Sequence, residues 1–286
     1  MSNNFYTLIT GASEGFGKAL AIECARRRMN LILVALPGVE LHRVADFIKS
    51  KYPVDVVCIE KDLCIDGSCL EVFHVADARG LQVNVLLNNV GIGTTGLFAD
   101  TTIEEYEKQI KLNVLATTVI TRLFLDMLKR NSPSHILNIG SLASFFPLPK
   151  KQVYGATKSY IYYFSECLRA ELKKDKVNVS LLCPGVMKTN KAVTSIIQNS
   201  HYLLRRSCIE PGKLAPFVID EMFKRKKRII SGKLNKGYVM LYSILPGFIK
   251  SIITNCTMKK LTSHTLTADF SNKSFRFEAD KACQHL

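Results

Sequence analysis

Runs of Val, Ile and Leu alternate with helical patterns from residue 5 to about residue 185, and this alternation constrains the fold more than any other feature of the chain. Continuous apolar runs are typical of strands that are buried on both faces of a parallel sheet. The pattern therefore predicts a doubly wound α/β (Rossmann) fold, with helices on both faces of the sheet and a C-terminal helical extension. The expected strands are residues 5–10, 31–36, 54–63, 83–91, 134–141 and 177–185, and the expected helices are residues 18–28, 39–52, 67–79, 103–130 and 152–174.

Beyond residue 185 the alternation of strands and helices becomes irregular, so we divide the chain into a core, an extension and a tail. Residues 1–190 form the expected core. Residues 191–261 are expected to form a loop and a basic, apolar extension of the same domain, in which residues 190–211 are a loop or helical pair over the carboxyl edge of the sheet. Residues 262–286 are polar and lack periodicity, so we expect a loosely ordered tail.

The nine cysteines are spread along the chain, and none of them forms a C-x-x-C pair. This usage favours reduced thiols over a disulfide framework or a zinc site, so we expect no metal. The first residues, "MSNNFYTLIT", lack the basic segment and apolar segment of a secretory signal. Together these features predict a cytoplasmic protein, with membrane association left open by the charge pattern below.

The net charge of +15 is concentrated near the C-terminus, where residues 221–260 contain ten Lys or Arg and one acidic residue. Such a segment suggests an anionic partner, for example a membrane surface or a nucleic acid. The alternative is a solvated basic face beside a phosphate-bearing ligand. No familiar nucleic-acid motif accompanies the charge, so we do not expect nucleic-acid binding.

Two short motifs in the core carry chemistry. "TGASEGFG", residues 10–17, follows the first strand and opens the first helix. Its glycines permit a tight turn and a close approach of a ligand to backbone N–H groups, and the helix N-terminus favours a phosphate. In "VYGATKSY", Tyr154 and Lys158 lie one turn apart on one helix face.

On these motifs the chain resembles the short-chain dehydrogenase/reductase family over roughly residues 5–190. "TGASEGFG" matches the family's T-G-x-x-x-G-x-G, "KDL" at 61–63 matches its adenine-contacting aspartate, and "NNVG" at 88–91 matches N-N-A-G. Ser141 lies thirteen residues before Tyr154, which is the family's usual catalytic spacing, and "CPGVMKT" at 183–189 matches P-G-x-x-x-T. The resemblance is to the subgroup of ketoacyl and steroid-like ketone reductases.

The resemblance implies an oxidoreductase that transfers a hydride between a nicotinamide and a carbonyl or secondary alcohol, with Asn113, Ser141, Tyr154 and Lys158 as catalytic residues. Tyrosine has a pKa of about 10, and a nearby lysine ammonium is expected to favour the phenolate and lower that pKa. Ser141 would stabilise charge on the substrate oxygen, and Asn113 would hold a water. The alternative function is a non-catalytic regulatory or protein-binding module on the same fold.

The same resemblance implies a cofactor site, and one departure from the family pattern bears on the choice of cofactor. The second strand ends in Ala35 and Leu36, where an acidic residue would select NAD. We therefore expect NADP(H) to be favoured over NAD(H), with Lys61 or Arg43 as candidates to compensate for the missing basic residue. The expected cofactor-binding residues are Gly11, Ser13, Glu14, Gly15, Phe16, Gly17, Leu36, Asp62, Leu63, Asn89, Gly91, Tyr154, Lys158, Pro184, Gly185, Val186 and Thr189.

The basic segment continues into an apolar stretch, residues 238–258, which contains Lys250 and is broken at Pro246 and Gly247. We do not expect it to span a membrane. Two interpretations of residues 224–260 remain open: peripheral docking on a membrane, or a lid that lines the pocket for an apolar, lipid-like substrate. Members of the family commonly form homo-oligomers through the helices near 103–130 and 152–174, so a homo-oligomer is a further expectation.

Overall fold

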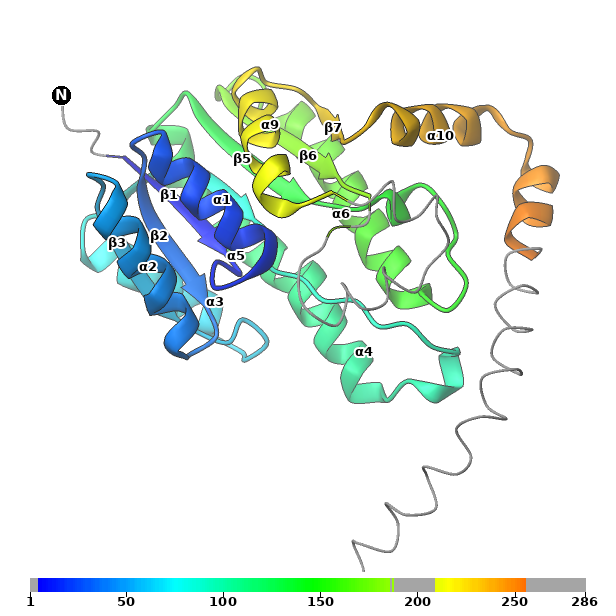
Figure 1. Ribbon diagram of the computed structural model, residues 1–286, viewed down its shortest axis with the longest axis horizontal. Helices are drawn as coiled ribbons and strands as arrows, with labels where there is room; N and C mark the ends of the chain where they lie inside the picture. The colour runs from blue at the N-terminus through cyan, green and yellow to red at the C-terminus, as the bar shows by residue number, and fades with distance from the viewer. Residues whose placement is uncertain (1–4, 186, 188–208, 256–286) are drawn as a thin grey trace, which may run out of the picture.

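The computed structural model describes residues 5–185, 187 and 209–255, and in these ranges seven strands form one central sheet (Figure 1). The strands pair in the order β3-β2-β1-β4-β5-β6-β7, and every pairing is parallel. The doubly wound α/β fold predicted from the alternation is therefore confirmed. The strands are β1 (Phe5–Thr10), β2 (Asn30–Ala35), β3 (Val56–Glu60), β4 (Gln82–Asn88), β5 (Ser134–Ile139), β6 (Val177–Cys183) and β7 (Arg228–Ile230).

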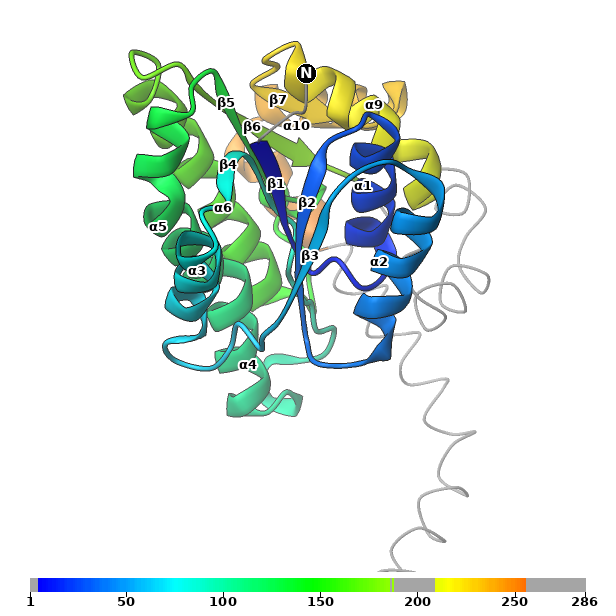
Figure 2. The same ribbon diagram turned by 90° about the vertical axis from the view of Figure 1, so that its left-hand side faces the viewer.

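Helices cover both faces of this sheet, as Figure 2 shows. One face packs against α1 (Gly15–Arg26), α2 (Val39–Lys51) and α9 (Pro211–Phe223) through a core that includes Leu20, Leu33 and Val218. The other face packs against α3 (Ser68–Ala78), α5 (Thr117–Arg130) and α6 (Gln152–Glu171). Because both faces are shielded from water, the central strands are continuous apolar runs.

Strand β1 is the point at which the strand order reverses, because it pairs with β2 on one side and β4 on the other. In open α/β sheets, ligands bind in the crevice outside the carboxyl ends of the strands at such a point. The turn after β1 carries the glycine motif, and the turn after β4 carries "NNVG". The topology thus brings two of the predicted motifs together.

The segment 103–130 differs from the single helix that its pattern predicts. It consists of α4 (Ile103–Ile110), a π-helical turn (Lys111–Ala116) and α5. A π-turn takes one additional residue into the helix and changes the direction of the side chains that follow. The side chain of Asn113, which lies within this turn, is fully buried.

Past residue 185, ahead of the predicted helical extension, the structure contains two elements that the sequence pattern did not predict, helix α9 and strand β7. Helix α9 packs against α1, and β7 adds a seventh strand beside β6. These elements escaped prediction because β7 is only three residues long and follows a run of four basic residues, while α9 contains Pro216. Its pairing with β6 and the burial of Ile229 stabilise β7 despite the charge around it.

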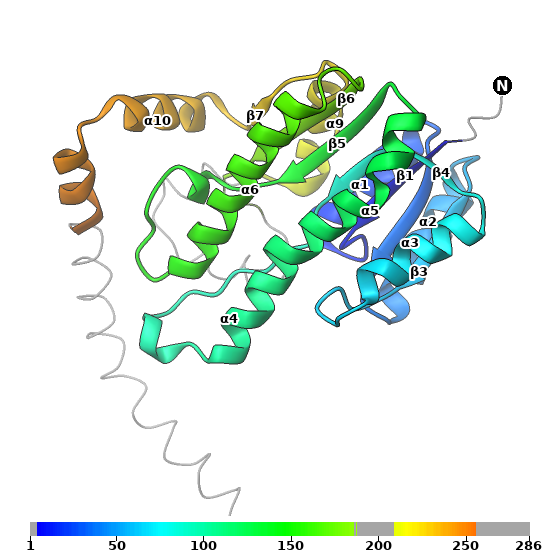
Figure 3. The same ribbon diagram turned by 180° about the vertical axis from the view of Figure 1, so that it is seen from behind.

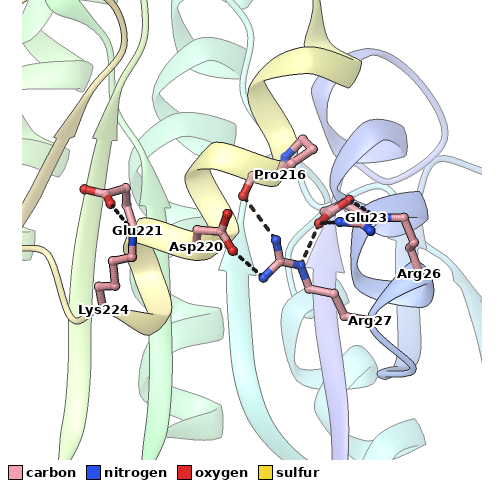
Figure 4. A network of polar contacts seen from close by, with 7 residues as sticks. All are labelled: Glu23, Arg26, Arg27, Pro216, Asp220, Glu221 and Lys224. Carbon is pink, nitrogen blue, oxygen red and sulfur yellow. Dashed lines mark hydrogen bonds and ion pairs between the residues drawn. The ribbon is translucent and has the colours of Figure 1, made fainter.

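An ion-pair network connects α9 to the helix that follows the glycine motif (Figure 4). The buried carboxylate of Glu23 accepts hydrogen bonds from Arg26 and Arg27, and Arg27 also pairs with Asp220 of α9 at 2.7 Å. Burial raises the pKa of Glu23, but the hydrogen bonds from the two arginines outweigh it and hold this pKa below its ordinary value. The network fixes α1, and with it the glycine turn, against the C-terminal part of the fold.

The predicted C-terminal helical extension is present. It comprises α10 (Lys233–Ile244) and a second helical stretch, residues 247–255, and it projects away from the rest of the fold (Figures 1 and 3). No helix within the described ranges is both long enough and apolar enough to cross a membrane. The predicted tail, residues 262–286, lies outside the described residues.

Candidate active site

The glycine motif forms the turn between β1 and α1. Gly11 and Gly15 have φ values of 66° and 55°, a left-handed conformation in which glycine is favoured over residues with a Cβ atom. Gly17 is required for a different reason, because a Cβ atom there would lie 2.0 Å from the carbonyl oxygen of Gly11. The buried side chain of Phe16 belongs to the core, so only its backbone faces the turn.

Hydrogen bonds from the β4 turn hold the glycine motif in place. The Nδ2 atom of Asn89 donates to the carbonyl oxygens of Thr10 and Gly11, at 2.9 and 3.1 Å. The Thr10 hydroxyl in turn accepts from the backbone N–H groups of Asn89 and Val90. Asn89 therefore stabilises the glycine turn of the predicted cofactor site. Thr10, which was not predicted as a site residue, stabilises the same turn.

Ser141, Tyr154 and Lys158 come together at the carboxyl end of β5. Ser141 lies two residues past the last residue of the strand, Ile139, and its Oγ accepts from the N–H of Ala143 at 3.1 Å. Tyr154 and Lys158 lie in the first two turns of α6. Lys158 is only 6% exposed, and its Nζ donates to the carbonyl oxygen of Ile139 at 2.8 Å. The three residues whose sequence spacing matched the family pattern therefore lie close together in the structure.

Burial dominates the protonation of this cluster. It raises the pKa of the Tyr154 phenol, and a hydrogen bond with the Ser141 hydroxyl opposes this rise only in part. Burial also lowers the pKa of Lys158 to about 8. The sequence-based expectation that Lys158 lowers the Tyr154 pKa is thus wrong as the net effect here, because the Lys158 Nζ lies 5.9 Å from the ring centroid and donates to a backbone carbonyl.

Asn113 connects the π-turn to both neighbouring elements of the site. Its Nδ2 donates to the carbonyl of Ile92 at 2.8 Å and to the hydroxyl of Thr157 at 3.0 Å, and its Oδ1 accepts from the N–H of Ile92. The Thr157 hydroxyl donates to the carbonyl of Tyr154. The Asn113 side chain therefore positions α6 and the loop after β4 through contacts with the protein.

Two glycines in that loop leave room for the side chains of Asn113, Tyr154 and Lys158. A Cβ atom on Gly91 would lie 2.9 Å from the Oδ1 of Asn113 and 3.3 Å from the Nζ of Lys158. A Cβ atom on Gly93 would lie 2.8 Å from the Tyr154 ring. Sequence reasoning found Gly91 through the "NNVG" motif but missed Gly93 and Thr157, for which no motif was considered.

The turn after β2, where cofactor choice is expected, contains an exposed Leu36 and an acidic group from another strand. The carboxylate of Glu60, at the end of β3, accepts a hydrogen bond from the N–H of Gly38 at 2.9 Å. This hydrogen bond and one from His42 lower the pKa of Glu60. The two proposed compensating cations are engaged, since Lys61 pairs with Glu71 and Arg43 with Glu40.

The other predicted cofactor residues occupy the same edge of the sheet. Asp62 begins the turn after β3, where its Oδ1 accepts from the N–H of Cys64 at 2.9 Å, and Leu63 is buried beside it. The carbonyl of Pro184 accepts from the N–H of Leu142, and a Cβ on Gly185 would lie 2.9 Å from the Nδ2 of Asn235. Ser13 and Glu14 belong to the glycine turn. Val186 and Thr189 lie outside the described residues.

These residues fit a dinucleotide. No side chain caps the N-terminus of α1 and its first turn has no acidic residue, so its backbone N–H groups can bind a phosphate, although the charge of the N-cap residue Glu14 opposes this. The buried ammonium of Lys158 has no carboxylate among its contacts in the described part of the chain. It is suited to donate hydrogen bonds to ribose hydroxyls. When bound, a nicotinamide cofactor would supply a hydride at this site.

The chain is similar in sequence and in fold to known dehydrogenases and reductases. A very-long-chain 3-oxoacyl-CoA reductase from Mus musculus is 32% identical over 191 residues, which are 65% of this chain and 61% of that protein. A short-chain dehydrogenase from Sphingobium yanoikuyae in complex with NADPH is 26% identical, has a TM-score of 0.72, and matches over 85% of this chain and 97% of that chain.

A short-chain dehydrogenase/reductase from Burkholderia phymatum in complex with NAD, 22% identical, shares the fold with a TM-score of 0.73 over 83% of this chain and 92% of that chain. The family model for short chain dehydrogenases matches residues 6–199. The matched range contains the glycine turn, the "NNVG" turn and the whole Ser141, Tyr154 and Lys158 cluster. The chain belongs to the short-chain dehydrogenase family.

Proposed function

We propose that the protein is an oxidoreductase that transfers a hydride between a nicotinamide cofactor and a carbonyl or secondary alcohol. The observation that carries this proposal is the cluster at the end of β5, where the hydroxyls of Ser141 and Tyr154 are hydrogen-bonded and the buried Lys158 ammonium lies beside the same ring. A purely structural role would not require a buried ammonium beside the Tyr154 ring, because burying a charge is costly.

In the reductive direction, Tyr154 donates its phenolic proton to the substrate oxygen as general acid. Ser141 donates a hydrogen bond to the same oxygen and stabilises the charge that grows there. The high pKa of the buried phenol keeps it protonated in the resting site, so the proton is available. Lys158 stabilises the phenolate that remains, and Asn113 fixes the helix that carries both groups.

An apolar substrate is supported by the loop that follows Ser141. Phe145 packs edge-on against Tyr162 with ring centroids 5.2 Å apart, and Phe146 packs against Tyr242 of α10 at 4.7 Å. Phe145 and Phe146 follow the proposed catalytic serine by four and five residues, and Phe146 contacts the C-terminal extension. This aromatic group provides an apolar surface on which a large ketone would be favoured over a small polar one.

NADP(H) is the proposed cofactor. The second strand lacks the acidic residue that selects NAD, and the relative from Sphingobium yanoikuyae holds NADPH. The ion pair of Arg43 is exposed and that of Lys61 is partly exposed, so both are weak, and either cation can exchange its carboxylate for a 2′-phosphate. Glu60 opposes this preference, but its carboxylate already binds Gly38 and His42.

Tyr154→Phe should lower kcat by about 10²–10⁴-fold, because general acid–base catalysis contributes this much and phenylalanine has no proton to donate. Cofactor affinity should be retained. Tyr160→Phe is the matched control, since Tyr160 lies on the same helix and its hydroxyl bonds only Thr118 among the described residues. Steady-state kinetics and a binding titration measure both effects. A kcat above about a tenth of wild type in Tyr154→Phe would show that another group is the acid.

Titration with the two cofactors should show tighter binding of NADPH than of NADH. Arg43→Gln should weaken NADPH binding by about two- to fivefold, the range expected for an exposed charge pair, and leave NADH unchanged. Glu60→Gln should have the opposite effect on NADPH, because it removes a negative charge beside the same turn. Tighter binding of NADH by the wild-type enzyme would exclude the proposed preference.

Within a series of linear ketones, each added methylene should raise kcat/KM by about fourfold until the pocket is filled, which corresponds to about 0.8 kcal/mol per buried methylene. Phe146→Ala should flatten this dependence, and Phe47→Ala on α2 provides a control at an exposed aromatic residue of another helix. A response that is flat across the series in the wild-type enzyme would rule out an apolar pocket.

A further inference from the structure

The outward face of α10 is apolar and exposed. Leu234, Tyr238 and Leu241 follow one another at spacings of four and three residues, and Met240 and Ile244 widen the same face. These five side chains are between 54% and 73% exposed. On a water-facing helix surface, polar residues would be expected instead.

The opposite side of α10 is the one that contacts the fold. Asn235 is buried, and its Nδ2 donates to the carbonyl of Ser231 at 2.7 Å. Tyr242 packs edge-on against Phe146. These contacts orient the helix, so the exposed apolar side chains lie on the side of α10 that does not contact the fold.

Apolar side chains are also exposed beyond the break at Pro246. They are Phe248 and Ile252 in the second helical stretch, residues 247–255. This stretch contacts α10, because the Nζ of Lys250 lies 5.2 Å from the centroid of the Tyr242 ring. We call residues 233–255 the C-terminal arm. Because the arm consists of two helical pieces that expose this apolar surface, the surface is typical of a site that contacts a partner outside the described fold.

The charge around the arm has a single sign. Four consecutive basic residues, 224–227, form the turn before β7, and Lys236 and Lys250 lie on the arm itself. The sequence from residue 224 to residue 255 contains no acidic residue. A second copy of the same arm would bring two basic clusters together, which is unfavourable. An anionic lipid surface would accept the apolar face and attract the basic groups at the same time.

We propose that the C-terminal arm docks flat on an anionic lipid bilayer, with its outward apolar face in the interface and its lysines at the lipid phosphates. On its other side, the Tyr242–Phe146 contact places the arm next to the loop that follows Ser141. If the proposed function holds, an apolar ketone dissolved in the bilayer has only a short path to the active site. The docking itself does not depend on activity.

The test is sedimentation of the full chain with vesicles of phosphatidylcholine alone and with a quarter of phosphatidylserine, at low and high salt. We expect binding to the anionic vesicles that weakens at high salt, since the electrostatic part is screened. The double variant Leu241→Glu/Ile244→Glu should reduce binding by about tenfold or more, because charged groups on the apolar face are excluded from the interface. Phe47→Glu, a change of the same kind at an exposed apolar residue of α2, should bind like wild type.

Inactive Tyr154→Phe should bind vesicles like wild type, which separates docking from catalysis. Unfolding curves and turnover of a water-soluble ketone check that the double variant is folded. Absence of binding to anionic vesicles at low salt, or equal binding by wild type and the double variant, would overturn the proposal. The proposal would also be overturned if the wild type did not bind vesicles and light scattering showed a wild-type dimer that the double variant does not form. The apolar face would then join two copies of the chain.

Discussion

The hydrogen bond from the buried ammonium of Lys158 to the carbonyl of Ile139 fixes the position of a charge at the centre of the site. It joins α6 to the carboxyl end of β5 at the point where Ser141 begins its turn. A pKa of about 8 in place of the ordinary 10.5 means that keeping this ammonium charged costs about 3 kcal/mol at neutral pH. The fold retains a charge that destabilises it, which is common where a side chain serves binding or catalysis.

The surrounding structure is arranged to make that burial possible. Gly91 leaves space beside the ammonium, and the π-turn directs Asn113 toward Thr157, on the same helix as Lys158. The reversal of strand order at β1 places the glycine turn next to the β4 turn, where Asn89 and Thr10 exchange hydrogen bonds. The glycine turn, the β4 turn and the cluster of Ser141, Tyr154 and Lys158 thus lie at the same edge of the sheet, where the carboxyl ends of the strands are.

The parts of this arrangement that the sequence predicts are those encoded by local patterns. The first six strands are apparent because each is a continuous apolar run, and Tyr154 and Lys158 are apparent because helical spacing is local. Contacts between distant segments were not apparent. Glu60 reaches the β2 turn from the next strand, Asn113 depends on a π-turn within an unbroken helical pattern, and β7 exists only because β6 pairs with it. The direction of the Tyr154 pKa shift was wrong because burial, a property of the tertiary structure, outweighs the nearby lysine.

We propose that Lys158 is kept charged and buried, at a cost in stability, in order to hold a nicotinamide cofactor beside Tyr154. Thermal unfolding of wild type and Lys158→Met at pH 7, each with and without NADPH, tests it in one measurement. Below a pH of about 8 the full cost of the buried charge is present, so without NADPH the variant should unfold at a higher temperature than wild type. NADPH should raise the unfolding temperature of wild type but not that of the variant, because only the protein that binds it is stabilised. A variant that is less stable without NADPH, or that gains as much from NADPH as wild type, would contradict the account.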